Sequence, residues 1–385
     1  MAQVKQRSNG RWSVRIRRTG WPVQTRTFRT RADADAWARA VEREMDTNSF
    51  IPRDDAERTS FASAAQRYIA EVLPRLRGKV QTEYLIKRLV GVFGTYSLAS
   101  ITSALLASYR DERLKAVSPQ SVVHELGMIS RIYKVAAMDW GMALPRGNPV
   151  ALVRKPPLRN ERERRLVDNE EELLSAALRT CKHPYPHTAF VLAVETAARQ
   201  SELIALTWED INLHARVARI RGKNGGVTKN GDTFRDVPLS TRAVNTLKAL
   251  PLPRSGSVLR MSQNSLKLAW QRAVCRARQN HLHEMLRQRL TAAGLSAAEQ
   301  EREIRALVFR KRTPSPRTNQ LLKDLETSDK TLAELKFHDL RHEATSRLAE
   351  RLEMHELMKV TGHKTSRTLV RYYHPRAADL AKKLA

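Results

Sequence analysis

The sequence FHDLRHEATSRLAERLEMHELMKVTGHKTSRTLVRYYH, residues 337–374, contains the residues that decide how this chain is interpreted. His338 and Arg341 lie in HDLR, His363 lies in TGH, and Tyr372 follows His363 by nine residues. The spacing of His338 and Arg341 puts both on one face of a helix. An arginine fork pairs with two phosphate oxygens and keeps its charge, and a tyrosine phenol can attack phosphorus. These residues therefore predict a site that binds and cleaves a phosphodiester.

Two further cations lie upstream, Arg199 in TAARQSEL and Lys229 in TKNGDTFRDVPL. A second arginine can bind the non-bridging phosphate oxygens, because fixed cations replace a metal in neutralising the transition state. A lysine can protonate the leaving 5′-hydroxyl, and a histidine can transfer a proton. Each residue alone is compatible with a surface ion pair or a buried ring, but the fixed order favours catalysis. The candidate catalytic residues are Arg199, Lys229, His338, Arg341, His363 and Tyr372.

The chain is strongly basic, with 69 Lys and Arg against 40 Asp and Glu in 385 residues, a net charge of +29. Such an excess predicts a polyanionic partner whose binding weakens as salt rises. A ribosomal or nucleoid protein also has this composition. A membrane-surface protein is disfavoured because no basic amphipathic stretch accompanies a lipid anchor. Two cysteines, Cys181 and Cys275, give no disulfide framework, and no apolar run of membrane-spanning length exists, so we expect a cytoplasmic, nucleoid-associated protein.

The first 32 residues contain nine basic residues and no acidic one. Alternation over Arg11–Arg18 and Val23–Thr30 predicts strands, and Thr30-x-x-Asp33 predicts the start of a helix that runs to about Met45. We expect a three-stranded sheet packed on this helix. Its arginines are expected to form one basic face that contacts DNA, although a merely solvated face has the same composition. The candidate DNA-contacting residues are Arg11, Arg15, Arg17 and Arg26.

The remainder divides at two polar linkers, residues 48–58 and 154–165. Helical periodicity over 59–150 predicts a small bundle. Beyond Leu166, AFVLAVETAARQSELIAL predicts one long helix, and Val217–Arg221 with Phe234–Val237 predicts a hairpin. Residues 277–333 are interpreted as an insertion rather than a domain, with two amphipathic stretches followed by KRTPSPRTN, which is typical of disorder.

Together, these blocks resemble tyrosine recombinases of the phage-integrase family. TAARQSELIALTWEDI is similar to the family's first-arginine block, and TKNGDTFRDVPL to its lysine-bearing hairpin. FHDLRHEATSRL is similar to the second block and TGHKTSRTLVRYYH to the third. The resemblance covers residues 166–385 strongly and the helical region moderately, and the first 55 residues resemble an arm-type DNA-binding domain.

The resemblance implies a mainly α fold with small β-sheets (α+β) in three domains: 1–55 (arm-type), 56–155 (helical, core-binding) and 156–385 (catalytic, with an insertion at about 277–333). By resemblance, Arg199 and Arg341 clamp the scissile phosphate, and His363 hydrogen-bonds it. Likewise Lys229 is the general acid, His338 assists proton transfer, and Tyr372 forms a 3′-phosphotyrosine. No metal or cofactor is implied. The implied partners are double-stranded DNA at core and arm sites, a homotetramer, and an accessory DNA-bending or directionality protein.

Several alternatives remain open at this point. Lys223 competes with Lys229, whose distance to Val237 is one residue longer than the family pattern, and Tyr373 competes with Tyr372. The clusters Cys181–His187 and Cys275–His283 lack a regular zinc-ligand spacing. A non-catalytic DNA-binding protein and a type IB topoisomerase are competing functions. Within recombinases, the sequence does not separate an integrase from a shufflon-type DNA invertase.

Overall fold

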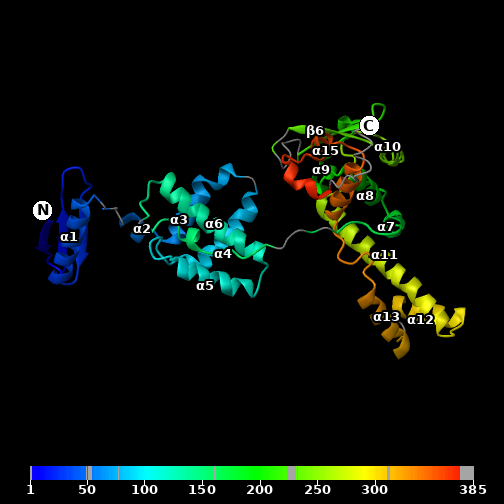
Figure 1. Ribbon diagram of the computed structural model, residues 1–385, viewed down its shortest axis with the longest axis horizontal. Coiled ribbons are helices and arrows are strands. Elements are labelled where there is room, and N and C mark those ends of the chain that lie inside the picture. Colours follow the sequence, from blue (N-terminus) through cyan, green and yellow to red (C-terminus); the bar gives the residue numbers. More distant parts are fainter. Residues whose placement is uncertain are drawn as a thin grey trace, which may run out of the picture. The chain divides into compact units, whose positions relative to one another are not determined.

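The computed structural model describes residues 2–48, 50, 54–76, 78–144, 146–158, 162, 164–222, 231, 233–309 and 313–372. In these ranges the fold is mainly helical with two three-stranded antiparallel sheets, which confirms the predicted fold class (Figure 1). The chain divides into two compact units, Met1–Asn160 and Glu161–Ala385. Across the described ranges, no helix is both long and apolar enough to cross a membrane.

The first unit begins with the predicted sheet and helix. Strands β1 (Ala2–Gln6), β2 (Trp12–Ile16) and β3 (Gln24–Phe28) pair in that order, and helix α1 spans Arg31–Asp46. The Thr30 hydroxyl accepts a hydrogen bond from the Asp33 amide, so the expected capping interaction starts α1. Apolar side chains of β2 and α1 form the small core: Val14, Ile16, Ala34, Ala38, Val41 and Met45.

The strand register corrects the prediction that all four arginines share one face. Arg15 pairs with Thr25, and Val14 pairs with Arg26. Directly opposed residues of an antiparallel pair lie on the same face, so Arg26 shares the face of the buried Val14. Arg15 lies on the opposite, exposed face, where Arg17 and Arg11 are also exposed. Arg26 is half-buried beside the Phe28 ring. The alternation within each strand is as predicted. In β3, however, the residues on the exposed face are one position away from those expected, so Arg26 lies on the face of Val14.

The rest of the first unit is the expected helical bundle. Its core is one continuous apolar cluster that includes Phe61, Phe93, Leu126 and Tyr133. Ser and Thr side chains cap three of its helices at their N-termini, as their residue types favour. The elements are α2 (Asp54–Arg58), α3 (Phe61–Glu71), the 3₁₀ turn η1 (Leu73–Arg75), α4 (Lys79–Phe93), α5 (Ser103–Leu114), α6 (Pro119–Met138) and η2 (Pro149–Leu152).

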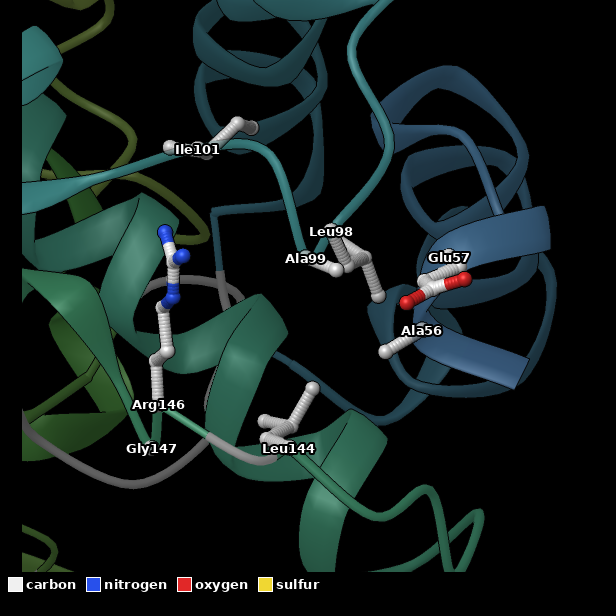
Figure 2. A pocket seen from close by; sticks show the side chains of 8 residues that line it. All are labelled: Ala56, Glu57, Leu98, Ala99, Ile101, Leu144, Arg146 and Gly147. Atoms are coloured by element: carbon white, nitrogen blue, oxygen red, sulfur yellow. The ribbon is translucent and has the colours of Figure 1, made fainter. Parts of the chain in front are cut away.

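A cavity of about 270 Å³ lies in this bundle (Figure 2). Figure 2 shows Leu98 and Leu144 among the apolar side chains that line it, with Glu57 and Arg146 as the charged residues of the lining. None of the predicted catalytic residues belongs to this unit. The cavity is therefore a feature of the helical packing and separate from the candidate site.

The second unit surrounds a larger apolar core. Its sheet consists of β4 (Ile211–Asn212), β5 (Val217–Arg221) and β6 (Phe234–Pro238), with the predicted hairpin pairing between β5 and β6. Residues such as Phe190, Trp270 and Leu340 from different helices meet in the core. The helical elements are α7 (Glu170–Arg179), α8 (Tyr185–Thr196), α9 (Gln200–Ala205), η3 (Trp208–Asp210), α10 (Thr241–Lys248), α11 (Gln263–Ala292), α12 (Ala297–Phe309), α13 (Pro316–Ser328), α14 (Asp339–Ala349), α15 (Met354–Thr361), η5 (Ser366–Thr368) and η6 (Val370–Tyr372).

The insertion is a helical projection built on one long helix. The N-terminal half of α11 packs in the main core through residues such as Trp270, whereas its far half packs against α12 and α13 (Figure 1). A separate apolar cluster holds this projection together: Leu282, Leu286, Leu290, Ile304 and Leu325. The prediction of disorder is wrong for Ser315–Asn319, because Ser315 caps α13 and Pro316 occupies its first turn, where proline is favoured.

We expect Leu286→Ala to destabilise this projection locally. The side chain is fully buried, so its removal leaves a cavity and costs about 2–5 kcal/mol of the free energy of unfolding. Native-state hydrogen exchange of the amides in α11 to α13 measures the effect. Val308→Ala, at an exposed position of α12, is the matched control. Equal protection in the two variants would contradict the packed cluster.

Candidate active site

Arg199 lies at a break between two helices. The sequence predicted one helix over AFVLAVETAARQSELIAL, and this is wrong. Helix α8 ends at Thr196, Ala197 adopts left-handed backbone angles (φ 54°), and α9 begins after Arg199. No glycine or proline marks the break, so propensity did not reveal it. The break leaves the Ala197 carbonyl oxygen available and places the Arg199 side chain at the start of a new helix.

Glu202 holds two arginines from one buried position. Its Oε1 accepts a hydrogen bond from Arg199 Nη1 (2.8 Å), and its Oε2 accepts one from Arg235 Nη2 (2.7 Å). Its Oε2 also accepts from the Arg199 backbone amide at 2.9 Å. Burial opposes ionisation, but the hydrogen bond and charge of Arg235, together with Arg199, lower the pKa of Glu202 to about 2. The carboxylate is therefore charged at neutral pH and fixes both guanidinium groups.

Arg341, on α14, is the most buried cation of the site. Its side chain donates to the Ala197 carbonyl, to the Thr361 carbonyl at 2.6 Å and towards His363 Nε2 at 3.5 Å. Burial and the positive charges of Arg199 and Arg235 lower the pKa of Arg341 to about 9, so it stays protonated at neutral pH. Glu202 bonds two of the three guanidinium groups and acts on Arg341 at longer range, so the three positive charges gathered here suit a bound anion.

His363 is placed by the end of α15. Gly362 terminates this helix with left-handed angles (φ 71°), and a Cβ at this residue would lie 3.3 Å from Arg235 Cδ. Both the backbone angle and the close approach therefore favour glycine in TGH. Thr361 Oγ1 lies 2.7 Å from His363 Nδ1, which orients the ring. The opposite ring nitrogen faces Arg341, so His363 and Arg341 belong to one hydrogen-bonded cluster.

Tyr372 lies in η6, and its neighbour on α14 is His342. The Tyr372 hydroxyl is hydrogen-bonded to His342 Nδ1, and the two rings stack with centroids 5.8 Å apart. His342 directly follows Arg341 on α14, so this hydrogen bond holds the phenol against the helix segment that carries Arg341. His338 is exposed at the N-terminus of α14, with its ring centroid 5.6 Å from that of His342. The structure thus gathers Arg199, His338, Arg341, His363 and Tyr372 in one region.

Three candidates cannot be placed. Lys229 and its competitor Lys223 lie in the β5–β6 connection, and Tyr373 follows η6; all three are outside the described residues. Arg221 and Phe234, the last paired residues of the hairpin, flank the connection that carries both lysines. The choice between the lysines therefore stays a prediction.

Buried carboxylates anchor the start of this unit to α14. Arg162 donates to both oxygens of Asp339 at 2.7 and 2.8 Å, and Arg165 donates to Glu343 at 3.1 Å. Despite burial, the Arg162 interaction lowers the pKa of Asp339. The predicted linker, rich in arginine, thus makes specific contacts on either side of Arg341.

Sequence reasoning missed Arg235, His342 and the structural part played by Glu202. Arg235 lies inside TKNGDTFRDVPL, where alternation points it inward with Val237. His342 directly follows Arg341 in the sequence. A second histidine so close to Arg341 was the one signal that could have marked it as a candidate site residue. Among the residues described, no group of three His, Cys, Asp or Glu side chains is arranged to hold a metal ion.

Comparison with known proteins identifies the family and the fold of this chain. Residues 164–379 match the phage integrase family. A shufflon-specific DNA recombinase of Escherichia coli is 32% identical, over 87% of this chain and 74% of its own length. The Tn1549 transposon integrase in complex with transposon right-end DNA has a similar fold (TM-score 0.56, 15% identity, 85% of this chain and 98% of that one). So does a lambda integrase tetramer bound to a Holliday junction (TM-score 0.55, 17% identity, 97% and 95%).

The fold and the family match are those of an enzyme class that transfers DNA strands, the tyrosine site-specific recombinases. The chain belongs to the phage integrase family of tyrosine site-specific recombinases.

We expect the stability of this unit to depend on pH through Glu202. Its pKa is about 2 when folded, against an ordinary value of 4.5, so the ionised form stabilises the fold above pH 4.5. That contribution, about 3 kcal/mol, is lost as the pH falls towards 2. Urea unfolding of wild type and Glu202→Gln between pH 7 and about pH 2.5 measures it. Glu202→Gln should lack this part of the fall, and the exposed Glu172→Gln should retain it; identical curves for wild type and Glu202→Gln would contradict the assignment.

Proposed function

We propose that this recombinase cleaves double-stranded DNA at a specific core site by attack of Tyr372, forming a 3′-phosphotyrosine and a free 5′-hydroxyl. The observation that carries the proposal is the cluster of Arg199, Arg341, His363 and Tyr372 in one region of the second unit. The bond energy of the cleaved diester is kept in the phosphotyrosine, so the reaction requires no nucleotide cofactor. A 5′-hydroxyl of a second strand reverses the step and joins the strands.

The described residues of the site each have a role that their position supports. Arg341 is held by two carbonyl oxygens, and Arg199 by Glu202, so both forks are oriented before DNA binds. Preorganised donors stabilise the developing charge on the phosphoryl oxygens without reorganisation. His363 donates a hydrogen bond to the same phosphate, and His338 assists proton transfer from the exposed end of α14. Lys229 protonates the leaving 5′-oxygen.

The remainder of the chain serves recognition in this proposal. Residues 56–155 bind the core site beside the catalytic domain of residues 156–385, and residues 1–55 bind separate arm sites through Arg11, Arg15 and Arg17. The net charge of +29 supports binding to a polyanion. Two rounds of strand exchange pass through a Holliday junction on a homotetramer, with an accessory DNA-bending or directionality protein as a further partner. The expected location is the bacterial cytoplasm, at the nucleoid.

The biological outcome is integration or excision of a mobile element, which the basic N-terminal segment supports. DNA inversion is the second candidate, because the relative from Escherichia coli that is 32% identical is a shufflon-specific recombinase. The two outcomes share one chemistry and differ in the placement of the sites. Recombination of paired sites in direct and inverted orientation on one plasmid distinguishes them.

Tyr372→Phe should abolish covalent cleavage while leaving DNA binding intact, because it removes the attacking oxygen alone. Wild type and variant are incubated in EDTA with nicked DNA from the ends of the protein's own element, and the adduct is mapped by peptide analysis.

Arg199→Ala and Arg341→Ala should each slow adduct formation by about 10²–10³-fold or more, as for a lost transition-state donor. An adduct on Tyr373, or wild-type cleavage by Tyr372→Phe, would overturn the assignment.

Deletion of residues 1–55 should spare cleavage of a minimal core site but impair integration, because arm-site binding is lost. Gel-shift and recombination assays with core-only and core-plus-arm DNA measure the two activities. Arg15→Ala with Arg17→Ala should reproduce the arm defect, and Arg26→Ala should affect it less, because Arg26 lies on the other face of the sheet. Loss of core cleavage on deletion would instead make this segment part of the core-site clamp.

A further inference from the structure

His342 is placed on the reacting atom of the proposed nucleophile. It follows Arg341 on α14, and its Nδ1 is hydrogen-bonded to the Tyr372 hydroxyl. The two rings are nearly parallel, with an interplanar angle of 30° and centroids 5.8 Å apart. None of the roles that the resemblance assigns falls on this histidine. We propose that His342 accepts the phenolic proton of Tyr372 as the phenol attacks phosphorus, an inference that rests on Tyr372 being the nucleophile.

The packing fixes the ring of His342 on two sides. Tyr372 contacts its Nδ1 edge, and His338, four residues earlier on the same face of the helix, meets it edge to face at 5.6 Å and 85°. His342 is half-buried, so the ring has less freedom than an exposed histidine. A ring held in this way presents the same nitrogen to the phenol throughout, which a proton acceptor in an attack step requires.

The charges around His342 suit a ring that becomes an imidazolium. The charge of His342 contributes to lowering the pKa of Asp339, which is also paired with Arg162, so this carboxylate lies within electrostatic range of the ring. Imidazole is the side chain that gains and releases a proton most readily near neutral pH. Asp339 therefore stabilises the product of proton transfer, while the arginine cluster beside Tyr372 stabilises the developing negative charge on the phenol oxygen and phosphate.

The step balances without another reactant. In the acceptor state the neutral ring carries its proton on Nε2 and offers the Nδ1 lone pair to the phenol. The bond from Tyr372 Oη to phosphorus forms, the bond from phosphorus to O5′ breaks, and the phenolic proton moves to Nδ1. The leaving O5′ takes its proton from the general acid, Lys229 in the proposed function. When a 5′-hydroxyl attacks the phosphotyrosine, the imidazolium returns its proton to Oη.

This assignment separates His342, within α14, from His338, the residue that precedes this helix. His342 serves the phenol, and His338, exposed at the start of the helix, serves the phosphate side. The distinction can be measured because the two steps use different atoms. Asparagine at residue 342 keeps a hydrogen-bonding group near the place of Nδ1 but cannot take up a proton at neutral pH. The variant His342→Asn therefore keeps the phenol of Tyr372 oriented but removes the group that accepts its proton.

The test is single-turnover formation of the covalent adduct on nicked core-site DNA by the full-length protein. We expect His342→Ala and His342→Asn each to slow adduct formation by about 10²-fold or more, the range typical of a lost proton-transfer group. Added imidazole should raise the rate of His342→Ala at least about tenfold, by supplying the missing acceptor. It should not restore Tyr372→Phe. His355→Ala, at an exposed position of α15, is the matched control and should react as wild type does.

The outcomes are separable. If wild type forms no adduct at Tyr372, the proposed function itself fails. If wild type does, and His342→Asn also reacts at the wild-type rate, His342 is not the proton acceptor. The same conclusion follows if folded, DNA-bound His342→Ala is slow but imidazole does not raise its rate. Thermal unfolding and core-site binding establish that each variant is folded, and the asparagine variant decides alone if the alanine variant does not fold.

Discussion

The site depends on one buried carboxylate, Glu202, placed between Arg199 and Arg235. A guanidinium that binds phosphate must be oriented but must not be neutralised, and a shared carboxylate achieves this because it holds two forks with a single negative charge. Arg341 is oriented differently, by the carbonyl oxygens of Ala197 and Thr361, which contribute dipoles and no formal charge. The result is a partly desolvated site with a fixed excess of positive charge. Removal of one partner would leave the others buried and uncompensated, which is costly.

Much of this arrangement was predictable from the sequence, because its signals are local. The order Arg199, His338, Arg341, His363, Tyr372 predicted a site, and the structure brings these residues together. Alternation identified β5 and β6, and the capping pattern at Thr30 identified the start of α1. Gly362 is a further local signal, since its left-handed angle ends α15. In each case the residue type has a physical reason to stand where it does.

The errors arose where distant contacts override local preference. The break after α8 has no glycine or proline, and it is stabilised by Arg341, which donates to the Ala197 carbonyl from a helix far along the chain. Helix α11 continues into the insertion because Leu282 and Leu286 find partners on α12 and α13, which periodicity alone does not reveal. The face of Arg26 depends on the register between two strands, and a shift of one residue reverses it. His342 was missed because its partner lies thirty positions away.

The arginine contacts at the start of the second unit also determine how α14 is held. Arg162 and Arg165 bind carboxylates of Asp339 and Glu343, on either side of Arg341 in the same helix. Two ion pairs thus join the start of the second unit to the helix that carries Arg341 and His342. The position of α14, and with it that of Arg341, therefore depends on residues at the very start of the second unit.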